Sequence, residues 1–159
     1  MQIYIDTELW VFAQKSPDPS RFKDRAEYKR MLGFHVKSRE FLKEQFANNS
    51  ISMTSHQLFE IYHALGFRGQ KMEPLELLEY CRKLTSNKII TWYRISNDII
   101  TRAINLSANS RVHIWDYICV LPLYKDVEII YSCDEHFKHD TFQSLGPKIK
   151  NPLEEWITL

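Results

Sequence analysis

Residues 2 to 6 read Gln2-Ile3-Tyr4-Ile5-Asp6, an alternating and partly β-branched run that ends on an acid. This pattern is typical of a β-strand whose carboxyl end carries Asp6. Residues 127 to 131, Val-Glu-Ile-Ile-Tyr, have the same character, and Asp134 follows shortly after them. The sequence therefore predicts two strands that each lead directly to an aspartate.

Working outward from these two segments, helical and extended patterns alternate along the chain. Further strands are expected at 51–53 and 88–92, with a minor edge strand at 148–149. Helices are expected at 7–14, 21–48, 54–67, from 73–74 onward, at 96–108 and from 110 until Pro122 ends the helix. Gly33 allows the 21–48 segment to divide into two shorter helices.

Apolar spacing predicts which faces of two later helices point inward. In the helix that begins at 73–74, these are Leu75, Leu78 and Cys81. In the 96–108 helix, they are Ile99, Ile100, Ala103 and Ile104. Strands that alternate with helices imply an α/β fold with a parallel sheet covered on both faces.

Length and composition place the chain among globular proteins. Its 159 residues and 44% hydrophobic content fit one domain that spans residues 1–159. No apolar run is long enough for a membrane span, and no export leader precedes the first strand. Three widely spaced cysteines fit reduced thiols better than a disulfide framework. We therefore expect a cytoplasmic protein without membrane contact.

Charge is unevenly distributed, although the net charge is only +1. Residues 15–43, hereafter the basic segment, hold nine Lys or Arg against four Asp or Glu. Residues 116–159 hold eight acids against four bases. The basic segment is a candidate RNA-binding surface, with Arg21, Lys23 and Arg25 as its contacts; a solvated helix face is the alternative.

Four acids are predicted to converge at one edge of the sheet, where open parallel sheets bind ligands beyond the carboxyl ends of their strands. Glu60 and Asp116 lie in the second turns of expected helices that begin near this edge. We refer to Asp6, Glu60, Asp116 and Asp134 as the four acids. Ligands made only of oxygen suit a hard cation such as Mg²⁺ or Mn²⁺.

The sequence resembles the PIN-domain family, in particular its VapC-like toxin branch, over nearly the whole chain. The segments that carry the resemblance are 3–7, 55–65, 114–117, 129–137 and 151–153. Two positions depart from the usual pattern: Glu8 stands where asparagine is common, and Ser132 where threonine is common. The order and spacing of these segments are more specific than any one of them alone.

The resemblance implies an α/β/α sandwich around a sheet of strand order 3-2-1-4-5. It implies that the four acids hold Mg²⁺ or Mn²⁺ and that the protein is an endoribonuclease that cuts single-stranded RNA with a metal-activated water. Thr7 and Ser132 are expected to be hydroxyls that support the acids rather than nucleophiles. The resemblance also implies a homodimer and an antitoxin partner. The toxin of a toxin–antitoxin pair is therefore the leading interpretation.

Other interpretations stay open at this point. A catalytically silent PIN-like module that binds RNA or protein, an RNA-processing nuclease and, less well supported, a small phosphatase are the alternative functions. Cys133, His136 and His139 form an incomplete zinc pattern, for which a solvated helix face is the favoured alternative. His113 lies three residues before Asp116 and is a candidate to hydrogen-bond it, but an ordinary packed histidine is the favoured interpretation. Some of four aromatic side chains are candidates for an exposed apolar groove that takes the antitoxin: Trp10, Phe12, Phe34 and Phe41.

Overall fold

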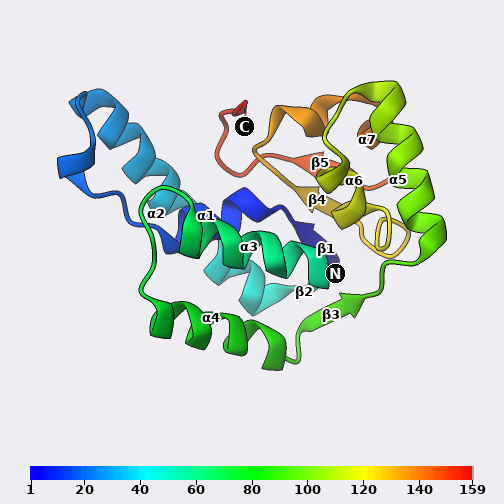
Figure 1. Ribbon diagram of the computed structural model, residues 1–159, viewed down its shortest axis with the longest axis horizontal. Helices are drawn as coiled ribbons and strands as arrows, with labels where there is room; N and C mark the ends of the chain where they lie inside the picture. The colour runs from blue at the N-terminus through cyan, green and yellow to red at the C-terminus, as the bar shows by residue number, and fades with distance from the viewer. Residues whose placement is uncertain (159) are drawn as a thin grey trace.

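Five parallel strands form one sheet in a computed structural model that describes residues 1–158. The strands are β1 (Gln2–Ile5), β2 (Ser50–Thr54), β3 (Ile90–Tyr93), β4 (Ile129–Tyr131) and β5 (Lys148–Lys150). Their order is β3-β2-β1-β4-β5, and β1 is central, with Tyr4 opposite both Ser52 and Ile130. The predicted strand order is confirmed, and Figure 1 shows the sheet between its helices.

Seven α-helices and two short 3₁₀ segments connect the strands. The helices are α1 (Thr7–Gln14), α2 (Arg25–Asn48), α3 (Ser55–Phe67), α4 (Pro74–Ser86), α5 (Asn97–Ser110), α6 (Ile114–Val120) and α7 (Asp140–Gln143). The 3₁₀ segments are η1 (Pro19–Arg21) and η2 (Glu135–Lys138). The expected break of the second helix at Gly33 does not occur, because α2 is continuous and a glycine with open space around it is tolerated there.

The alternation along β1 divides the core into two layers. Ile3 and Ile5 face a cluster that includes residues of α1, α2, α3 and α4. Tyr4 faces the opposite cluster, which includes residues of α5, α6 and α7. Helices thus cover both faces of the sheet, as the period-two pattern of the first strand requires, and the α/β/α sandwich is confirmed.

The inward faces predicted for α4 and α5 are partly wrong. In α4, Leu77 and Leu84 are buried, whereas Leu75 is 80% exposed. Leu78 is also exposed, and the buried stripe consists of residues 77, 80, 81 and 84. Because leucines lie on both sides of this outer helix, the sequence pattern does not show which side faces the core. Of the three residues predicted to face inward, only Cys81 packs against the core.

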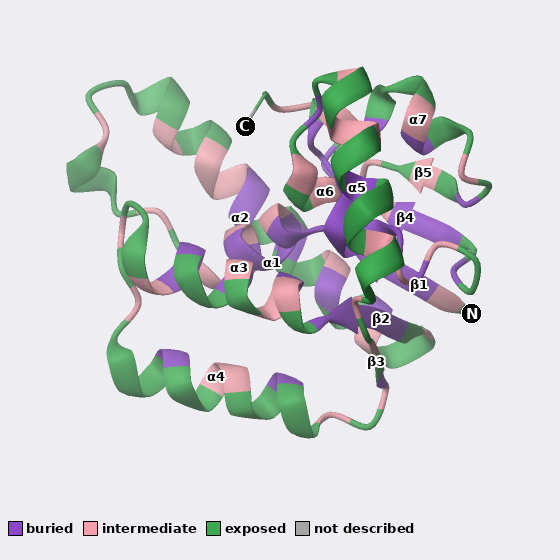
Figure 2. Cartoon of the chain, turned by 45° about the vertical axis from the view of Figure 1, so that its right-hand side comes forward, coloured by how far each residue is buried: buried purple, intermediate pink, exposed green. Residues whose placement is uncertain are grey.

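The same error affects α5. Ala103 is buried and Ile99 packs against the core, but Ile100 and Ile104 lie on the exposed side. The inward stripe continues to Leu106, which gives the i, i+4, i+7 spacing expected of one helix face. The remaining apolar residues of α5 therefore belong to the protein surface, as the mixed colours of this helix in Figure 2 show.

The helix that carries Asp116 begins later than predicted. Ser110 ends α5 instead of opening α6, because its hydroxyl donates to Leu106 O at 2.7 Å. Arg111 then takes a left-handed conformation (φ 63°), which stops the helix. Asp116 consequently lies in the first turn of α6 and not in a second turn.

The predicted apolar groove is not formed by its four candidate residues. Trp10 is fully buried and donates its indole N–H to Ile5 O at 2.9 Å. Phe34 is buried, and Phe12 packs on it with ring centroids 5.4 Å apart. Phe41 packs against Tyr131. Trp10 and Phe34 therefore belong to the core, whereas Phe12 and Phe41 are partly buried and pack against it, and Phe41 lines a shallow surface pocket beside Pro152.

None of the helices within residues 1–158 has the length and apolar character that crossing a membrane requires.

Candidate active site at the carboxyl edge of the sheet

Asp6 and Asp134 lie at the carboxyl ends of the adjacent strands β1 and β4, and both are nearly buried. Asp6 caps α1 by accepting a hydrogen bond from Thr7 N at 2.8 Å, and its other oxygen accepts one from Ser132 Oγ at 2.7 Å. Asp134 accepts from His136 N at 2.9 Å, while its own N–H donates to Ser132 Oγ at 3.0 Å. The Ser132 hydroxyl therefore ties the two aspartates together.

Glu60 reaches the same edge from the second turn of α3. Its Oε2 accepts a hydrogen bond from Thr7 Oγ1 at 3.0 Å and one from Cys119 Sγ at 3.4 Å. Its Oε1 lies 3.5 Å from His56 Nε2, one helical turn earlier. Thr7 thus contacts one acid and Ser132 another, in the positions from which hydroxyls can orient carboxylates.

Asp116 enters the site from α6 and meets a histidine that was not predicted. His136 Nδ1 lies 3.0 Å from Asp116 Oδ2 and 3.4 Å from Asp134 Oδ2. His113 packs against the His136 ring with centroids 4.9 Å apart, in line with the interpretation of this residue as an ordinary packed histidine. η2 begins directly after Asp134 and brings the imidazole of His136 next to Asp116.

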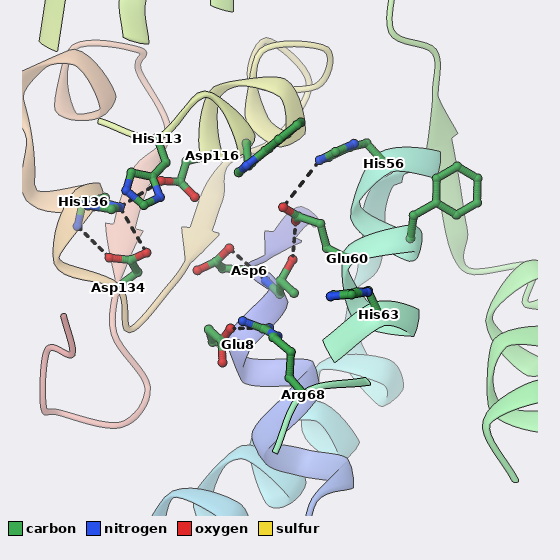
Figure 3. Close-up of a pocket in the computed structure, with 13 residues that line it drawn as sticks. Asp6, Glu8, His56, Glu60, His63, Arg68, His113, Asp116, Asp134 and His136 are labelled. Carbon is green, nitrogen blue, oxygen red and sulfur yellow. Dashed lines mark hydrogen bonds and ion pairs between the residues drawn. The ribbon is translucent and has the colours of Figure 1, made fainter. Parts of the chain in front are cut away.

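The four acids line one pocket of about 570 Å³. Asp116, Asp134 and His136 line it and offer ligand atoms that all lie within 4.8 Å of one another. His56, Glu60 and Cys119 form a second group with the same spacing, although the buried Cys119 is not among the residues that line the pocket. Figure 3 draws Asp6 between these two groups. The acids are therefore gathered at one edge, although the 4.8 Å spacing does not extend over all four.

Burial and mutual repulsion disfavour the charged forms of two of these carboxyls. Burial raises the pKa of Asp6 well above its usual value, and the nearby Asp116 raises it further. Burial, followed by the charges of Asp134 and Glu60, raises the pKa of Asp116 to about 8. These are the pKa shifts expected of carboxylates that share a small volume without enough compensating charge.

Glu60 behaves differently, because its oxygens are well supplied with donors. Burial alone would raise its pKa, but the contact with His56 and the hydrogen bonds from Thr7 and Cys119 outweigh burial and lower it. Glu60 is thus charged in the range where the pKa of Asp116 lies. It contributes to the repulsion that Asp116 experiences.

The donor chemistry of the pocket fits a hard divalent cation. No Lys or Arg in residues 1–158 forms an ion pair with any of the four acids. The pocket's arginine, Arg68, is paired with Glu8 at 3.0 Å, which accounts for the glutamate where asparagine is common. Buried carboxylates are rarely stable without a cationic partner, and four oxygen donors are what Mg²⁺ or Mn²⁺ accepts.

The zinc pattern suspected from the sequence does not assemble. Cys133 is fully buried in the cluster under α1 to α4. His139 caps α7, where its Nδ1 accepts a hydrogen bond from Thr141 N at 3.2 Å. Only His136 of the expected trio points to the acids. The turn of η2 points Cys133, His136 and His139 in different directions, so their short spacing in the sequence did not indicate a shared zinc site.

The basic segment lies apart from this pocket. Arg21 ends η1, and Lys23 and Arg25 precede or begin α2. None of the three is among the residues that line the pocket. Figure 1 shows the first turns of α2 extending away from the sheet. Any role in RNA binding must therefore be exerted outside the pocket.

Comparison with known proteins places this architecture. No family model and no curated protein matches the sequence. Among solved structures, VapC20 of Mycobacterium tuberculosis, described as a Sarcin-Ricin loop cleaving toxin, superposes with a TM-score of 0.55 at 13% identity, over 80% of this chain and 86% of that one. A chain of VapBC2 from Rickettsia felis, solved bound to a DNA fragment from their promoter, gives 0.57 at 13% identity, over 95% and 98%. The chain therefore has the PIN-domain fold of VapC proteins.

Proposed function

We propose that the protein is a metal-dependent endoribonuclease that cuts single-stranded RNA and acts as the toxin of a toxin–antitoxin pair. The observation that carries this proposal is the convergence of four carboxylates in one pocket, without a Lys or Arg partner, on a fold shared with VapC toxins. A ribonuclease is favoured over a silent binding module because each acid is intact and faces the same pocket.

In the proposed reaction, the four acids hold Mg²⁺ or Mn²⁺. When bound, the cation lowers the pKa of a water molecule and stabilises the leaving oxygen of the phosphodiester. Ser132 keeps Asp6 oriented, and Thr7 does the same for Glu60. His136, through its contacts with Asp116 and Asp134, fixes the relative position of these two carboxylates.

The first prediction concerns metal dependence. Purified protein should cleave an unstructured RNA in Mg²⁺ or Mn²⁺, lose this activity in excess chelator and regain it when Mg²⁺ is restored. The reason is that, without a cation, the negatively charged carboxylates repel the phosphate of the RNA and do not lower the pKa of a water molecule. Cleavage that persists in chelator would contradict the proposal, and RNA binding without cleavage under any metal would identify the silent module.

Two exposed aromatic side chains at the pocket offer stacking surfaces for unpaired bases. Trp115 is 53% exposed and Phe59 is 64% exposed, and both line the pocket. One face of the Trp115 ring already stacks on His56, with centroids 5.0 Å apart and planes inclined by 14°. This contact fixes the indole, and a fixed exposed ring is the feature on which single-stranded nucleic acids stack.

Replacing Trp115 with alanine is therefore expected to weaken RNA binding about tenfold, since each stacked base contributes roughly 1–3 kcal/mol. The dissociation constant should be measured in an Asp116→Asn background so that the RNA stays intact. Trp92→Ala is the matched control, because Trp92 is a partly exposed tryptophan on β3 outside the pocket. Equal effects of the two substitutions would exclude Trp115 as a base contact.

The basic segment gives a separate prediction. If Arg21, Lys23 and Arg25 contact the RNA backbone beyond the pocket, replacing all three with serine should reduce the slope of log K against log salt by about 2, since each phosphate contact on a single strand contributes roughly 0.7. A double Lys148→Ser, Lys150→Ser variant serves as the control for lost charge. A slope equal to that of wild type would make the basic segment a solvated surface.

The antitoxin and the homodimer belong to the same proposal. The neighbour from Rickettsia felis is a VapBC2 structure, and an antitoxin is proposed here by that analogy. Because Trp10 and Phe34 are buried, an antitoxin would have to contact other residues than those two. Growth arrest on expression, relieved by a partner encoded beside this chain, would support the toxin role over RNA processing.

A further inference from the structure

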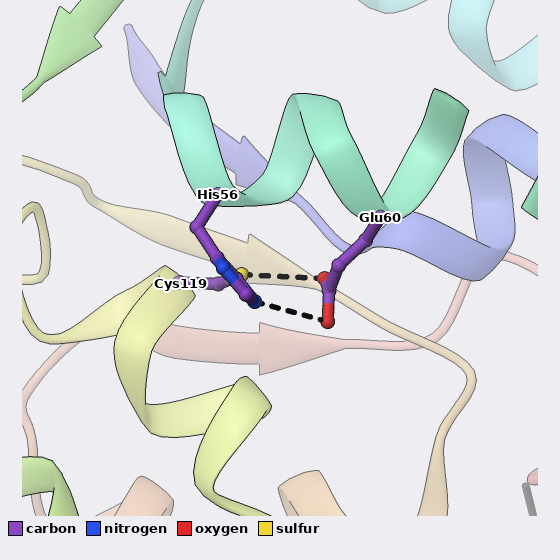
Figure 4. Close-up of side chains that lie close together, drawn as sticks. All are labelled: His56, Glu60 and Cys119. Atoms are coloured by element: carbon purple, nitrogen blue, oxygen red, sulfur yellow. Dashed lines mark hydrogen bonds and ion pairs between the residues drawn. The ribbon is translucent and has the colours of Figure 1, made fainter. Parts of the chain in front are cut away.

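A second group of possible metal ligands lies beside the four acids and has a different chemistry. It consists of His56, Glu60 and Cys119, whose ligand atoms all lie within 4.8 Å of one another. His56 and Glu60 are four residues apart on α3 and project from the same face, and Cys119 comes from α6 (Figure 4). Two helices on opposite sides of the pocket thus supply nitrogen, oxygen and sulfur donors to one point.

The imidazole of His56 is held in place for such a role. Its Nε2 is buried and has no hydrogen-bond partner, although Glu60 Oε1 lies 3.5 Å away. Trp115 stacks on the ring and fixes its plane. A buried ring nitrogen without a partner is uncommon and needs a physical reason. A cation between His56 and Glu60 would supply one.

Cys119, on α6, is the third member of the group and contacts Glu60. Its thiol is almost fully buried and donates to Glu60 Oε2 at 3.4 Å. A metal ion in this position would replace the thiol proton, which passes to solvent, and the sulfur would bind the ion as a thiolate.

We propose that His56, Glu60 and Cys119 form a site for zinc or a similar borderline-soft divalent ion. Imidazole, thiolate and carboxylate together are the ligands that zinc selects, whereas Mg²⁺ prefers oxygen alone. Three protein ligands leave the fourth tetrahedral position for water. The site is distinct from the four acids in its chemistry but shares Glu60 with them.

The shared carboxylate gives the site a consequence for cleavage. An ion held by His56, Glu60 and Cys119 draws Glu60 away from the hard cation, and its positive charge repels a second ion in the same pocket. Zinc should therefore inhibit the Mg²⁺-dependent reaction. The binding site itself stands independently of the nuclease, but this inhibition rests on the proposed function.

Cobalt(II) titration of the full chain tests the binding without any RNA. Wild-type protein should develop thiolate-to-cobalt charge-transfer absorption in the near ultraviolet, and zinc should displace the cobalt. Cys119→Ser should abolish the absorption, because serine keeps the hydrogen bond to Glu60 but supplies no thiolate. Cys81→Ser is the matched control and should leave the spectrum unchanged, since Cys81 lies on α4 outside the cluster.

A second variant distinguishes the loss of a metal ligand from a folding defect. His56→Phe keeps an aromatic ring for Trp115 to stack on but removes the nitrogen donor, so zinc affinity measured against a chromophoric chelator should fall at least tenfold at an unchanged melting temperature in chelator. Wild-type protein without the charge-transfer band, or a band that Cys119→Ser retains, would overturn the site. Either result can occur while Mg²⁺-dependent cleavage persists, so failure of this site is distinguishable from failure of the nuclease.

Discussion

Asp116→Asn is expected to lower the rate of Mg²⁺-dependent RNA cleavage on the order of 10³-fold, which is comparable to the loss when one preorganised electrostatic group is removed from an active site. Asparagine has nearly the same shape as aspartate but lacks the negative charge that holds a cation. Asp116 is well suited to this test because it caps no helix and accepts no backbone hydrogen bond among the contacts of residues 1–158. Its neutralisation should therefore leave the fold intact.

The measurement is single-turnover cleavage of an unstructured RNA at saturating enzyme, with circular dichroism to verify folding. Glu128→Gln is the matched control, because it neutralises an exposed acid just before β4, away from the pocket. It should cleave at the wild-type rate. A rate for Asp116→Asn within tenfold of wild type would show that this carboxylate does not act in cleavage.

The sheet and its strand order could be predicted because they depend on local signals. β1 and β4 are short apolar runs that lead to an acid, and the alternation of Ile3, Tyr4 and Ile5 determines which residues enter each layer. Helices on both faces follow from the parallel arrangement. Even the edge strand β5 was predicted, at residues 148–149, and the structure extends it by one residue to Lys150.

Helix phase was predicted less well where helices lie on the outside. In α5, Ile100 and Ile104 are as apolar as the residues that face inward, so sequence alone does not identify the buried side. The start of α6 was missed for a related reason. Ser110 is a good capping residue for either helix, and only the left-handed Arg111 decides that it ends α5.

The candidate site was likewise predicted only in part from the sequence. Asp6 and Asp134 closely follow strands, and Glu60 and Asp116 lie in the first two turns of helices, so the sequence pattern reveals their places and predicts them as a set. His136 and Cys119 were not predicted as their partners, because the contacts join residues 20 and 59 positions apart. His56 carries a usable signal, since its spacing of four from Glu60 on one helix places both on the same face.

The last prediction concerns stability and uses the metal-free protein. In chelator, Asp116→Asn should be more stable than wild type at pH 9 by on the order of 3–5 kcal/mol, because the folded pKa of Asp116 is about 8 against an ordinary value of 3.8. Burial and the charges of Asp134 and Glu60 cause this difference. The substitution removes the charge that folding must otherwise bury.

The sign of the pH dependence follows from the direction of the shift. Below pH 4 the carboxyl is protonated in both states and contributes no difference. As the pH rises from 4 to 8, the unfolded chain releases the proton first, so the free energy of unfolding of wild type falls and then levels off above pH 8. Asp116→Asn should show a smaller fall, because Asp6, whose pKa is also raised, still contributes to it, and Glu128→Gln should retain the full fall.

Because repulsion among the acids disfavours the charged form of Asp116, Asp116→Asn should melt higher than wild type in chelator at pH 9, by about 6–20 °C for a chain of this size. Mg²⁺ should then raise the melting temperature of wild type more than that of Asp116→Asn, because an ion that binds only the folded state stabilises it by mass action. A variant that melts lower than wild type in chelator at pH 9, together with a wild type that does not respond to Mg²⁺, would mean that the four acids are not a shared metal site.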